Sequence, residues 1–273
     1  IYKNWVPEEK ILHTNIWSSE LAKLTANAFL AQRISSINSI SALCESTGAD
    51  INQVKKAIGM DTRIGEKFLS PGPGFGGSCF QKDILNLVYL STFYKLEEVA
   101  NYWQGVIDIN NWQKSRISRL VVNNLFGNVS EKKIAILGFA FKANTNDTRE
   151  SASINICKDL IEEGAILFIH DPKVISSQIA SDLGKRENEK LKSLDDKANI
   201  YSFEGEWCFE KDILISSKGA DAIVVLTEWE EYHSINWKKV YALMRKPAWL
   251  FDSRSIANYQ DIKQTKLNFW RIG

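Results

Sequence analysis

Apolar residues recur at helical spacings along the first part of the chain. They are Leu21, Leu24, Ala28, Ile34, Ile37 and Leu43. This pattern predicts one helix from about Ser19 to Glu45, with Ser18 as its N-cap and Thr47-Gly48 at its end. At 1.5 Å per residue the helix is roughly 42 Å long. A helix longer than about 25 residues is unusual inside one core, so we expect it to form a subunit interface.

Three more helices follow in the first half. A short one begins at Asp50, where Gln53 three residues later has the form of a capping box, and ends near Gly59. Residues 60–78 are rich in glycine and proline and predict a loop. Helices are then expected from Cys79 to about Tyr94 and over 97–124, the second ended by Gly127.

The second half alternates short apolar strands with helices. Strands are predicted at 133–137, 165–169, 222–226, 249–251 and 267–271, and helices at 154–162 and 237–244. This alternation is typical of a parallel sheet covered by helices. Residues 173–208 are rich in Lys, Glu, Asp and Ser and predict a surface insertion. The expected fold class is therefore α/β, with a long-helix central dimerisation domain (1–127) followed by a Rossmann-like parallel α/β domain (128–273).

Composition narrows the possible partners and the compartment. The 273 residues carry a formal net charge of +1, so neither nucleic acid nor a membrane surface is expected as a partner. No apolar run reaches about 18 residues and no signal peptide is visible. The four cysteines are scattered, with no C-x-x-C pair, which favours a reducing, cytoplasmic setting and gives no metal site. Because the chain starts at Ile1 without a methionine, we expect it to be part of a longer protein.

The densest motif lies between Pro71 and Asp83. It contains a G-x-G-x-x-G at Gly72, Gly74 and Gly77, but no apolar strand precedes it and two prolines interrupt the backbone. A dinucleotide fingerprint needs that strand, so we reject this interpretation.

Cys79 is the candidate nucleophile of this segment. Ser78 and Gln81 have the spacing of a capping box, which predicts that a helix begins at Cys79. Unpaired N–H groups and the helix dipole there favour a thiolate. Asp83, four residues on, shares its helix face, and this pairing suits thioester formation followed by hydrolysis. A lone cysteine is more often buried filler, but the adjacent glycine pair, the cap and Asp83 favour the nucleophile.

Lys23 and Asn27 form a second i, i+4 pair, on the long helix. A buried lysine beside an amide can hold an oxyanion. From spacing alone, two ordinary surface residues are the stronger interpretation.

Four segments resemble the UDP-glucose 6-dehydrogenases, a family of nucleotide-sugar dehydrogenases. They are the run from Ser18 to Ala31, the run Gly74-Phe-Gly-Gly-Ser-Cys79-Phe-Gln-Lys-Asp83, the run Gly138-Phe-Ala-Phe-Lys142 and the run Asp147-Thr-Arg149-Glu-Ser. The similarity extends from Trp5 to about Arg254. The resemblance implies oxidation of UDP-glucose to UDP-glucuronate with NAD as cofactor, in a homodimer or higher homo-oligomer.

The resemblance also implies roles for single residues. Cys79 attacks an aldehyde, Asp83 positions or activates water, and Lys23 and Asn27 stabilise oxyanion states. The resemblance implies that the UDP-sugar is contacted by Arg63, Phe68, Gly74, Phe75, Gly76, Phe141, Lys142 and Arg254. Of these, Arg63 is implied to reach the substrate bound in the partner subunit. Contacts to the cofactor are implied for Lys82 and Arg149. Taken without the resemblance, the lysines and arginines are equally surface charges and the phenylalanines equally core.

Two departures limit what we expect of this chain. Where close relatives often have a basic residue this chain has Ser70, so we expect one sugar or phosphate contact to be lost. The family's N-terminal domain, which carries the true dinucleotide fingerprint, is absent, so we expect binding of the UDP end without turnover. Two alternatives stay open: another nucleotide-sugar dehydrogenase, acting on a UDP-N-acetyl sugar or GDP-mannose, and a non-catalytic UDP-sugar-binding or dimerisation module.

Overall fold

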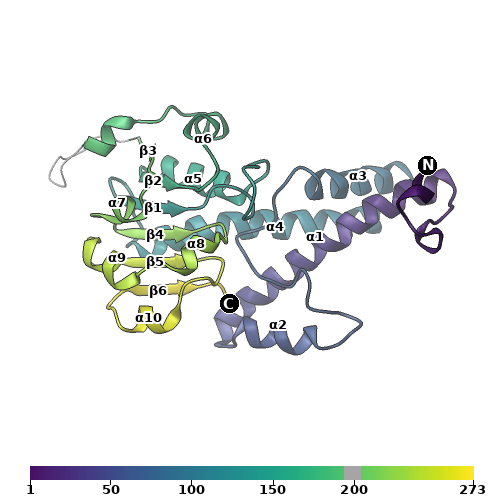
Figure 1. Ribbon diagram of the computed structural model, residues 1–273, viewed down its shortest axis with the longest axis horizontal. Helices are drawn as coiled ribbons and strands as arrows, with labels where there is room; N and C mark the ends of the chain where they lie inside the picture. The colour runs from purple at the N-terminus through teal and green to yellow at the C-terminus, as the bar shows by residue number, and fades with distance from the viewer. Residues whose placement is uncertain (194–203) are drawn as a thin grey trace.

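The computed structural model describes residues 1–193 and 204–273 and places a helical half beside an α/β half (Figure 1). The helical half contains short 3-10 turns at Tyr2–Asn4 and Glu8–Lys10, then α1 (Ile16–Thr47), α2 (Ile51–Gly59), α3 (Phe80–Phe93) and α4 (Glu97–Asn124). The predicted long helices and the loop between α2 and α3 are confirmed. At 32 residues, α1 is about 48 Å long.

Two of the predicted helix starts are wrong. Asn15, not Ser18, caps α1, because its side chain accepts a hydrogen bond from the Ser18 N–H at 2.8 Å and the helix starts earlier than predicted. The capping box at Ser78 does not form. Cys79 is itself the N-cap of α3, no side chain caps that end, and the Ser78 hydroxyl lies 3.8 Å from the Cys79 sulfur. The predicted cap at Asp50 is confirmed.

The α/β half is built on one six-stranded, all-parallel sheet. The strands are β1 (Lys133–Leu137), β2 (Ile166–His170), β3 (Glu206–Phe209), β4 (Ala222–Val225), β5 (Trp249–Asp252) and β6 (Asn268–Arg271). Their order is β3-β2-β1-β4-β5-β6. The helices are α5 (Ala152–Glu162), α6 (Ser176–Leu183), α7 (Ile213–Ser217), α8 (Glu230–His233), α9 (Trp237–Leu243) and α10 (Tyr259–Lys263). The predicted α/β class is confirmed.

Residues 173–208 are more than a surface insertion, so that prediction is wrong for their described part. They contain α6, a 3-10 turn at Glu189–Ser193 and most of the edge strand β3. Trp207 of β3 is fully buried, and β3 pairs with β2 in parallel register. These elements are short and the residues around them are polar, so the sequence has no clear apolar pattern that would predict them. Residues 194–203 lie outside the described part of the chain.

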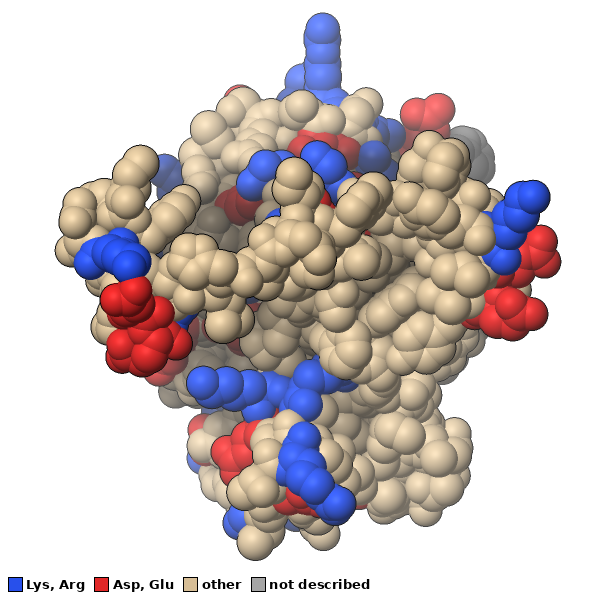
Figure 2. All heavy atoms as spheres, turned by 90° about the vertical axis from the view of Figure 1, so that its right-hand side faces the viewer, with Lys and Arg blue, Asp and Glu red and all other residues tan. Residues whose placement is uncertain are grey.

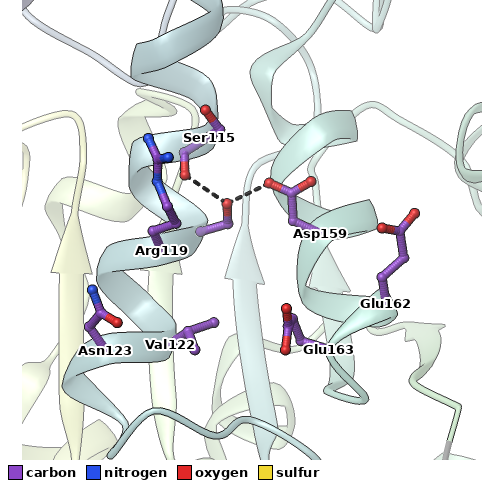
Figure 3. Close-up of a pocket in the computed structure, with 8 residues that line it drawn as sticks. Ser115, Arg119, Val122, Asn123, Asp159, Glu162 and Glu163 are labelled. Atoms are coloured by element: carbon purple, nitrogen blue, oxygen red, sulfur yellow. Dashed lines mark hydrogen bonds between the residues drawn. The ribbon is translucent and has the colours of Figure 1, made fainter.

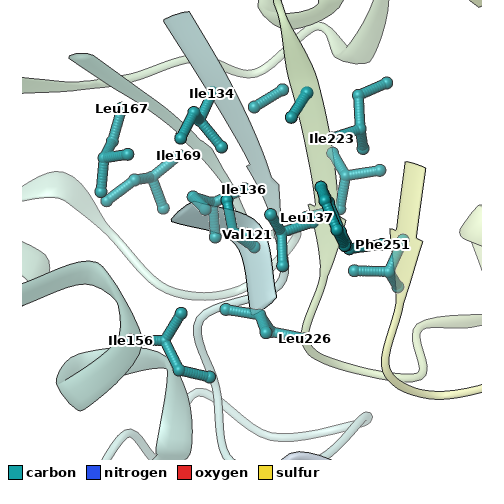
Figure 4. Packing of buried hydrophobic residues seen from close by; sticks show 14 of the residues in the cluster. Val121, Ile134, Ile136, Leu137, Ile156, Leu167, Ile169, Ile223, Leu226 and Phe251 are labelled. Atoms are coloured by element: carbon teal, nitrogen blue, oxygen red, sulfur yellow. The ribbon is translucent and has the colours of Figure 1, made fainter. Parts of the chain in front are cut away.

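The main core lies between the sheet and the helices packed on it. Ile134, Ile136, Ile223 and Phe251 are fully buried there, and Val121 of α4 packs among them (Figure 4). A smaller cluster holds α1, α3 and α4 together in the helical half. Because α4 contributes to both cores, it joins the two halves through continuous packing. The division between residues 127 and 128 stays a prediction.

A polar cluster joins the corner between α1 and α2 to the last strand. Glu45 of α1 pairs with Arg116 of α4 and accepts hydrogen bonds from the Trp270 ring N–H at 3.2 Å and the Gly273 N–H at 3.0 Å. The Arg116 and Glu45 side chains are only 13% and 19% exposed. The C-terminus therefore lies beside the end of α1 (Figure 1). Among the described residues, no helix combines the length and apolar character needed to cross a membrane.

Candidate active site

The α/β half presents its ligand-binding edge where the strand order reverses. The chain runs outward from β1 through β2 to β3, then returns to place β4 on the other side of β1. In open parallel sheets, ligands bind outside the carboxyl ends of the strands at this reversal. The loops after β1 and β4 are joined there, because the Thr227 hydroxyl donates to the Ala140 carbonyl at 2.6 Å.

The glycine-rich loop of the helical half docks against this edge. The Gly77 N–H donates to the Arg149 carbonyl at 2.7 Å. A Cβ on Gly76 would lie 2.6 Å from the Glu150 carbonyl oxygen and 2.9 Å from Phe141 Cβ, so no larger residue fits between the halves. This close approach explains the glycine at position 76.

Buried amide side chains hold the same loop from behind. Asn110 of α4 accepts from the Phe75 N–H at 2.8 Å and donates to the Phe75 carbonyl at 3.2 Å. Asn38 of α1 accepts from the Gly72 N–H at 2.9 Å. Both asparagines are fully buried, so the loop conformation is fixed by the helices beneath it.

A cleft of about 310 Å³ opens between the loop and the sheet edge. Its lining comes from both halves: Ile34, Phe68, Ser70, Gly72, Gly74, Phe75, Gly76, Phe80, Phe141, Lys142, Glu228 and Arg254. The structure thus brings together seven of the residues predicted to contact the substrate, namely Phe68, Gly74, Phe75, Gly76, Phe141, Lys142 and Arg254.

One part of the lining is aromatic. Phe75 and Phe68 each make an edge-to-face contact with Phe80, with ring centroids 5.9 and 6.4 Å apart. Phe75 is buried in the core of the helical half, whereas Phe68 is 42% exposed. Apolar rings of this kind suit a flat or partly apolar ligand surface.

Arg254 supplies the fixed cation of the cleft. Its side chain is 17% exposed and lies 3.1 Å from a carboxylate oxygen of Glu228. Its Nε donates to the Leu226 carbonyl at 2.8 Å, and one terminal nitrogen donates to the Phe141 carbonyl at 3.3 Å. Burial lowers the pKa of Arg254, opposed by the neighbouring carboxylates, but at neutral pH an arginine stays charged.

The predicted catalytic residues form a second cluster beside the cleft. Lys23 Nζ and Asn27 Nδ2, both on α1, donate to the same Asp83 carboxylate oxygen of α3, at 2.6 and 2.5 Å. Cys79 precedes the cleft residue Phe80, and its side chain is exposed. The hydrogen bond to Asp83 raises the pKa of Lys23, and a thiolate at Cys79 would raise it further.

The environment of Asp83 keeps it ionised. Burial alone would raise the pKa of Asp83. The hydrogen bonds from Lys23 and Asn27, together with the positive charges of Lys23 and Lys82, outweigh this effect and lower the pKa. Asp83 is therefore a carboxylate at neutral pH, held by α1. The predicted proximity to Cys79 along the helix is seen in the backbone, where the Asp83 N–H donates to the Cys79 carbonyl at 2.9 Å.

Three more predicted residues lie outside both the cleft lining and this second cluster. Arg63 is 88% exposed and paired with Asp61 in the loop after α2, and Lys82 is exposed on α3. Arg149 is 68% exposed and makes a two-point contact with Asp147, at 2.9 and 2.7 Å. The pKa of Arg149 is raised mainly by Asp147, with a smaller effect from Cys79. Arg149 is thus close enough to Cys79 for an electrostatic interaction, whereas the side-chain hydrogen bonds of Arg63 within the described part of the chain are all to Asp61.

Sequence reasoning missed part of the cleft lining, including Ile34 and Glu228. Glu228 had a usable signal, because it follows the predicted strand 222–226 and carboxyl ends of parallel strands carry ligand contacts.

The described residues do not fit a dinucleotide cofactor. In a dinucleotide site a glycine-rich turn connects a strand directly to a helix. Here β1 ends at Leu137 and α5 starts only at Ala152, while the G-x-G-x-x-G at Gly72, Gly74 and Gly77 follows a loop. Within the described part of the chain, no group of three or more His, Cys, Asp or Glu side chains is arranged to hold a metal ion.

A second hollow lies between α4 and α5, away from this edge (Figure 3). Its lining combines Arg119 with Asp159, Glu162 and Glu163, and the buried Ser118 hydroxyl donates to Asp159. The carboxylates do not converge on one point (Figure 3), so this hollow has no evident ligand.

Comparison with known proteins matches both halves of the chain. Residues 17–112 match the central domain of the UDP-glucose/GDP-mannose dehydrogenase family, and residues 135–259 match the UDP binding domain of the same family. The chain is 50% identical to the UDP-glucose 6-dehydrogenase of Drosophila melanogaster over its whole length, which covers 56% of that protein. It is 54% identical to the enzyme of that name from Bos taurus, over 94% of this chain and 50% of the relative.

Solved structures show the same fold. A UDP-glucose dehydrogenase from Pyrobaculum islandicum superposes with a TM-score of 0.74 at 25% identity, over 94% of this chain and 50% of that one. A UDP-D-ManNAc dehydrogenase from Pyrococcus horikoshii gives 0.77 at 23% identity, over 99% and 55%. The chain thus spans about half the length of the relatives it matches.

Proposed function

Because this chain belongs to the UDP-glucose/GDP-mannose dehydrogenase family, we propose that it binds UDP-glucose and supplies the covalent nucleophile for its oxidation to UDP-glucuronate. The observation that carries the proposal is the cleft at the strand-order reversal, where a buried arginine and a glycine loop followed by an exposed cysteine come together. The relatives named UDP-glucose 6-dehydrogenase favour this sugar.

The diphosphate of the substrate binds to Arg254 and Lys142. Guanidinium and ammonium groups make charge-assisted hydrogen bonds to phosphate oxygens. Arg254 is already oriented by two carbonyls and Glu228, so little side-chain freedom is lost on binding. Phe68, Phe75 and Phe141 cover apolar faces of the ligand, and the backbone at Gly74 and Gly76 admits the sugar close to the loop.

The sugar end then reaches Cys79. The Cys79 thiolate attacks the carbonyl carbon of the aldehyde, a sulfur–carbon bond forms, and the carbonyl electron pair moves to oxygen, giving a thiohemiacetal. Two oxidations are needed, of the sugar alcohol to the aldehyde and of the thiohemiacetal to the thioester, and NAD+ would accept a hydride in each. In the last step water adds to the thioester, the carbon–sulfur bond breaks, and the carboxylate product leaves with the thiolate restored. The exposed position of Cys79 at the start of α3 gives a substrate carbon access to the sulfur.

In these steps charges develop on the reacting atoms, and they are proposed to be stabilised or neutralised by Lys23, Asn27 and Asp83. Lys23 and Asn27 are proposed to supply positive charge and N–H groups to the oxyanion. The ionised Asp83 accepts from both, so it orients them and is placed to take a proton from the attacking water.

The family resemblance implies that hydride passes to NAD+. Since the described residues do not fit a dinucleotide, we assign none of them to hydride transfer. Lys82 and Arg149 are proposed only as contacts on the cofactor side of Cys79. The cysteines form no disulfide, which supports a reducing, cytoplasmic setting.

A homodimer is proposed through α1. Its side chains Leu21, Phe29, Ile40 and Leu43 are apolar and 40–58% exposed. Uncharged residues cover most of the end of the molecule that faces the viewer in Figure 2. Arg63 is proposed to reach the site of the second copy. Light scattering at micromolar concentration should give twice the chain mass, and a monomeric mass would contradict the dimer.

Calorimetric titration of the 273-residue chain tests the main proposal. UDP-glucose and UDP should bind, and NAD+ should not. Lys142→Met should weaken UDP-glucose binding, whereas the control Lys10→Met, on an exposed N-terminal turn, should not. A folded chain that binds neither UDP nor UDP-glucose contradicts the proposal.

The same titration separates the related sugars. UDP-N-acetyl sugars and GDP-mannose should bind more weakly than UDP-glucose. If GDP-mannose binds best, the chain belongs to the other branch of the family. This comparison matters because a structural neighbour at 23% identity acts on UDP-D-ManNAc by its name.

A further inference from the structure

The cleft has less positive charge than its proposed ligand requires. Lys142 and Arg254 contribute two cations to the lining, and Glu228 removes one of these charges by pairing with Arg254. A nucleotide-sugar diphosphate carries roughly two negative charges near neutral pH. The lining alone therefore leaves about one negative charge without a counterpart.

Lys55 of α2 stands at the rim of this cleft. Its Nζ donates a hydrogen bond to the Ser70 hydroxyl at 2.7 Å, and Ser70 is part of the cleft lining. Lys55 is half-buried, and within the described residues it forms no ion pair. Lysine side chains are mostly exposed, and they are almost never fully buried unless they are paired.

The position of Ser70 links Lys55 to the other cations. Gly72, two residues after Ser70, lies against Arg254, because a Cβ there would be 3.0 Å from the Arg254 Nη1. Two residues of chain span at most about 7 Å. Lys55 is therefore joined to the anion-binding wall through one hydrogen bond and two residues of chain.

We propose that Lys55 is a further substrate-binding residue, which adds the missing positive charge for the anionic part of the nucleotide. Of its three N–H donors, Ser70 uses one and two remain for the ligand. This inference rests on the proposed function, because it names a contact of the same cleft. Neither the sequence pattern nor the family resemblance assigned a role to Lys55.

Lys55→Met tests this contact, because methionine keeps the length of the side chain and removes the charge. Lys56→Met is the matched control, since Lys56 is the next residue of α2, is exposed and points to another face. Titrations with UDP and with uncharged uridine separate charge from shape. UDP affinity should fall roughly three- to tenfold in Lys55→Met, uridine affinity should change less than about twofold, and Lys55→Arg should restore UDP binding.

The outcomes are distinct. If wild-type chain binds UDP and Lys55→Met binds it equally well, the role of Lys55 is overturned while the proposed function stands. Equal losses for UDP and uridine also overturn it, because they indicate a change in loop shape. If the folded wild-type chain does not bind UDP, the proposed function itself is overturned.

Discussion

Replacing Gly76 by alanine is a direct test of how the two halves form the cleft. The added Cβ would lie 2.6 Å from the Glu150 carbonyl oxygen and 2.9 Å from Phe141 Cβ. Ordinary contacts between such atoms are about 3.5–4.0 Å, so the overlap is close to 1 Å on both atoms. One of the two atoms belongs to the backbone and the other is a Cβ, so no flexible side-chain end can move away.

The cost of this overlap should appear in two measurements. Overpacking of a tight contact costs about 1–3 kcal/mol. If the contact stays closed, the free energy of unfolding falls and Tm drops by about 2–4 °C for each kcal/mol in a chain of this size. If the contact opens, the segment that carries Phe141 and Lys142 moves away from the loop, and the loss appears in UDP affinity. The sum of the two losses should reach about 1–3 kcal/mol.

Thermal unfolding with and without UDP, together with titration calorimetry, measures both the loss of stability and the loss of UDP affinity. Gly105→Ala is the matched control, because a Cβ at Gly105 in α4 meets no atom within 4 Å. In a helix interior, alanine in place of glycine should stabilise by up to about 1 kcal/mol. If Gly76→Ala keeps Tm within about 1 °C and UDP affinity within about twofold, the close contact between the halves is refuted.

Three further predictions concern stability and reactivity. Glu45→Ala leaves the largely buried Arg116 without its ion-pair partner, so the free energy of unfolding in urea should fall by about 2–3 kcal/mol. The control Glu8→Ala removes an exposed ion pair and should lower it by less than about 1 kcal/mol. Equal effects of the two substitutions would contradict the burial argument. The pKa of Asp83 is lowered in the folded chain, so its stabilising effect is present above its unfolded value near 3.9 and is lost as pH falls through the folded pKa. Tm measured from pH 7 to 3 should therefore fall less steeply in Asp83→Asn, and an unchanged slope would refute this. Iodoacetamide near pH 7 should alkylate Cys79 first and leave Cys208 intact, since burial raises the pKa of that thiol to about 12; peptide mass spectrometry that finds Cys79 unmodified would favour a non-catalytic binding module.

The long and strongly patterned elements could be predicted from the sequence. The structure has α4 and β1 at the predicted residues, because a long apolar period and a compact apolar strand each have few competing interpretations. The short edge strand β3 was missed. Its apolar core is only Trp207, Cys208 and Phe209, and its pairing with β2 depends on residues 40 positions earlier in the chain. Such non-local pairing leaves no local signal.

In the candidate site, too, local features could be predicted from the sequence and tertiary contacts could not. The glycine loop and Cys79 stand out because their residue types are unusual in that order. The clustering of Lys23, Asn27 and Asp83 is tertiary, since the hydrogen bonds join positions 60 and 56 residues apart. Spacing along one helix indicated that Lys23 and Asn27 share a face, but it could not show which carboxylate they meet.

Contacts on two sides of the molecule limit motion between the halves. The Gly77–Arg149 hydrogen bond joins them at the cleft, and the hydrogen bonds from Trp270 and Gly273 to Glu45 join them at the C-terminal strand. Between these points, α4 is packed into both hydrophobic clusters. A hinge between the halves would have to break the Gly77 backbone hydrogen bond, the two hydrogen bonds to Glu45 and apolar packing together. The cleft is therefore formed before ligand binds, and UDP binding need not include the free energy of closing one half onto the other.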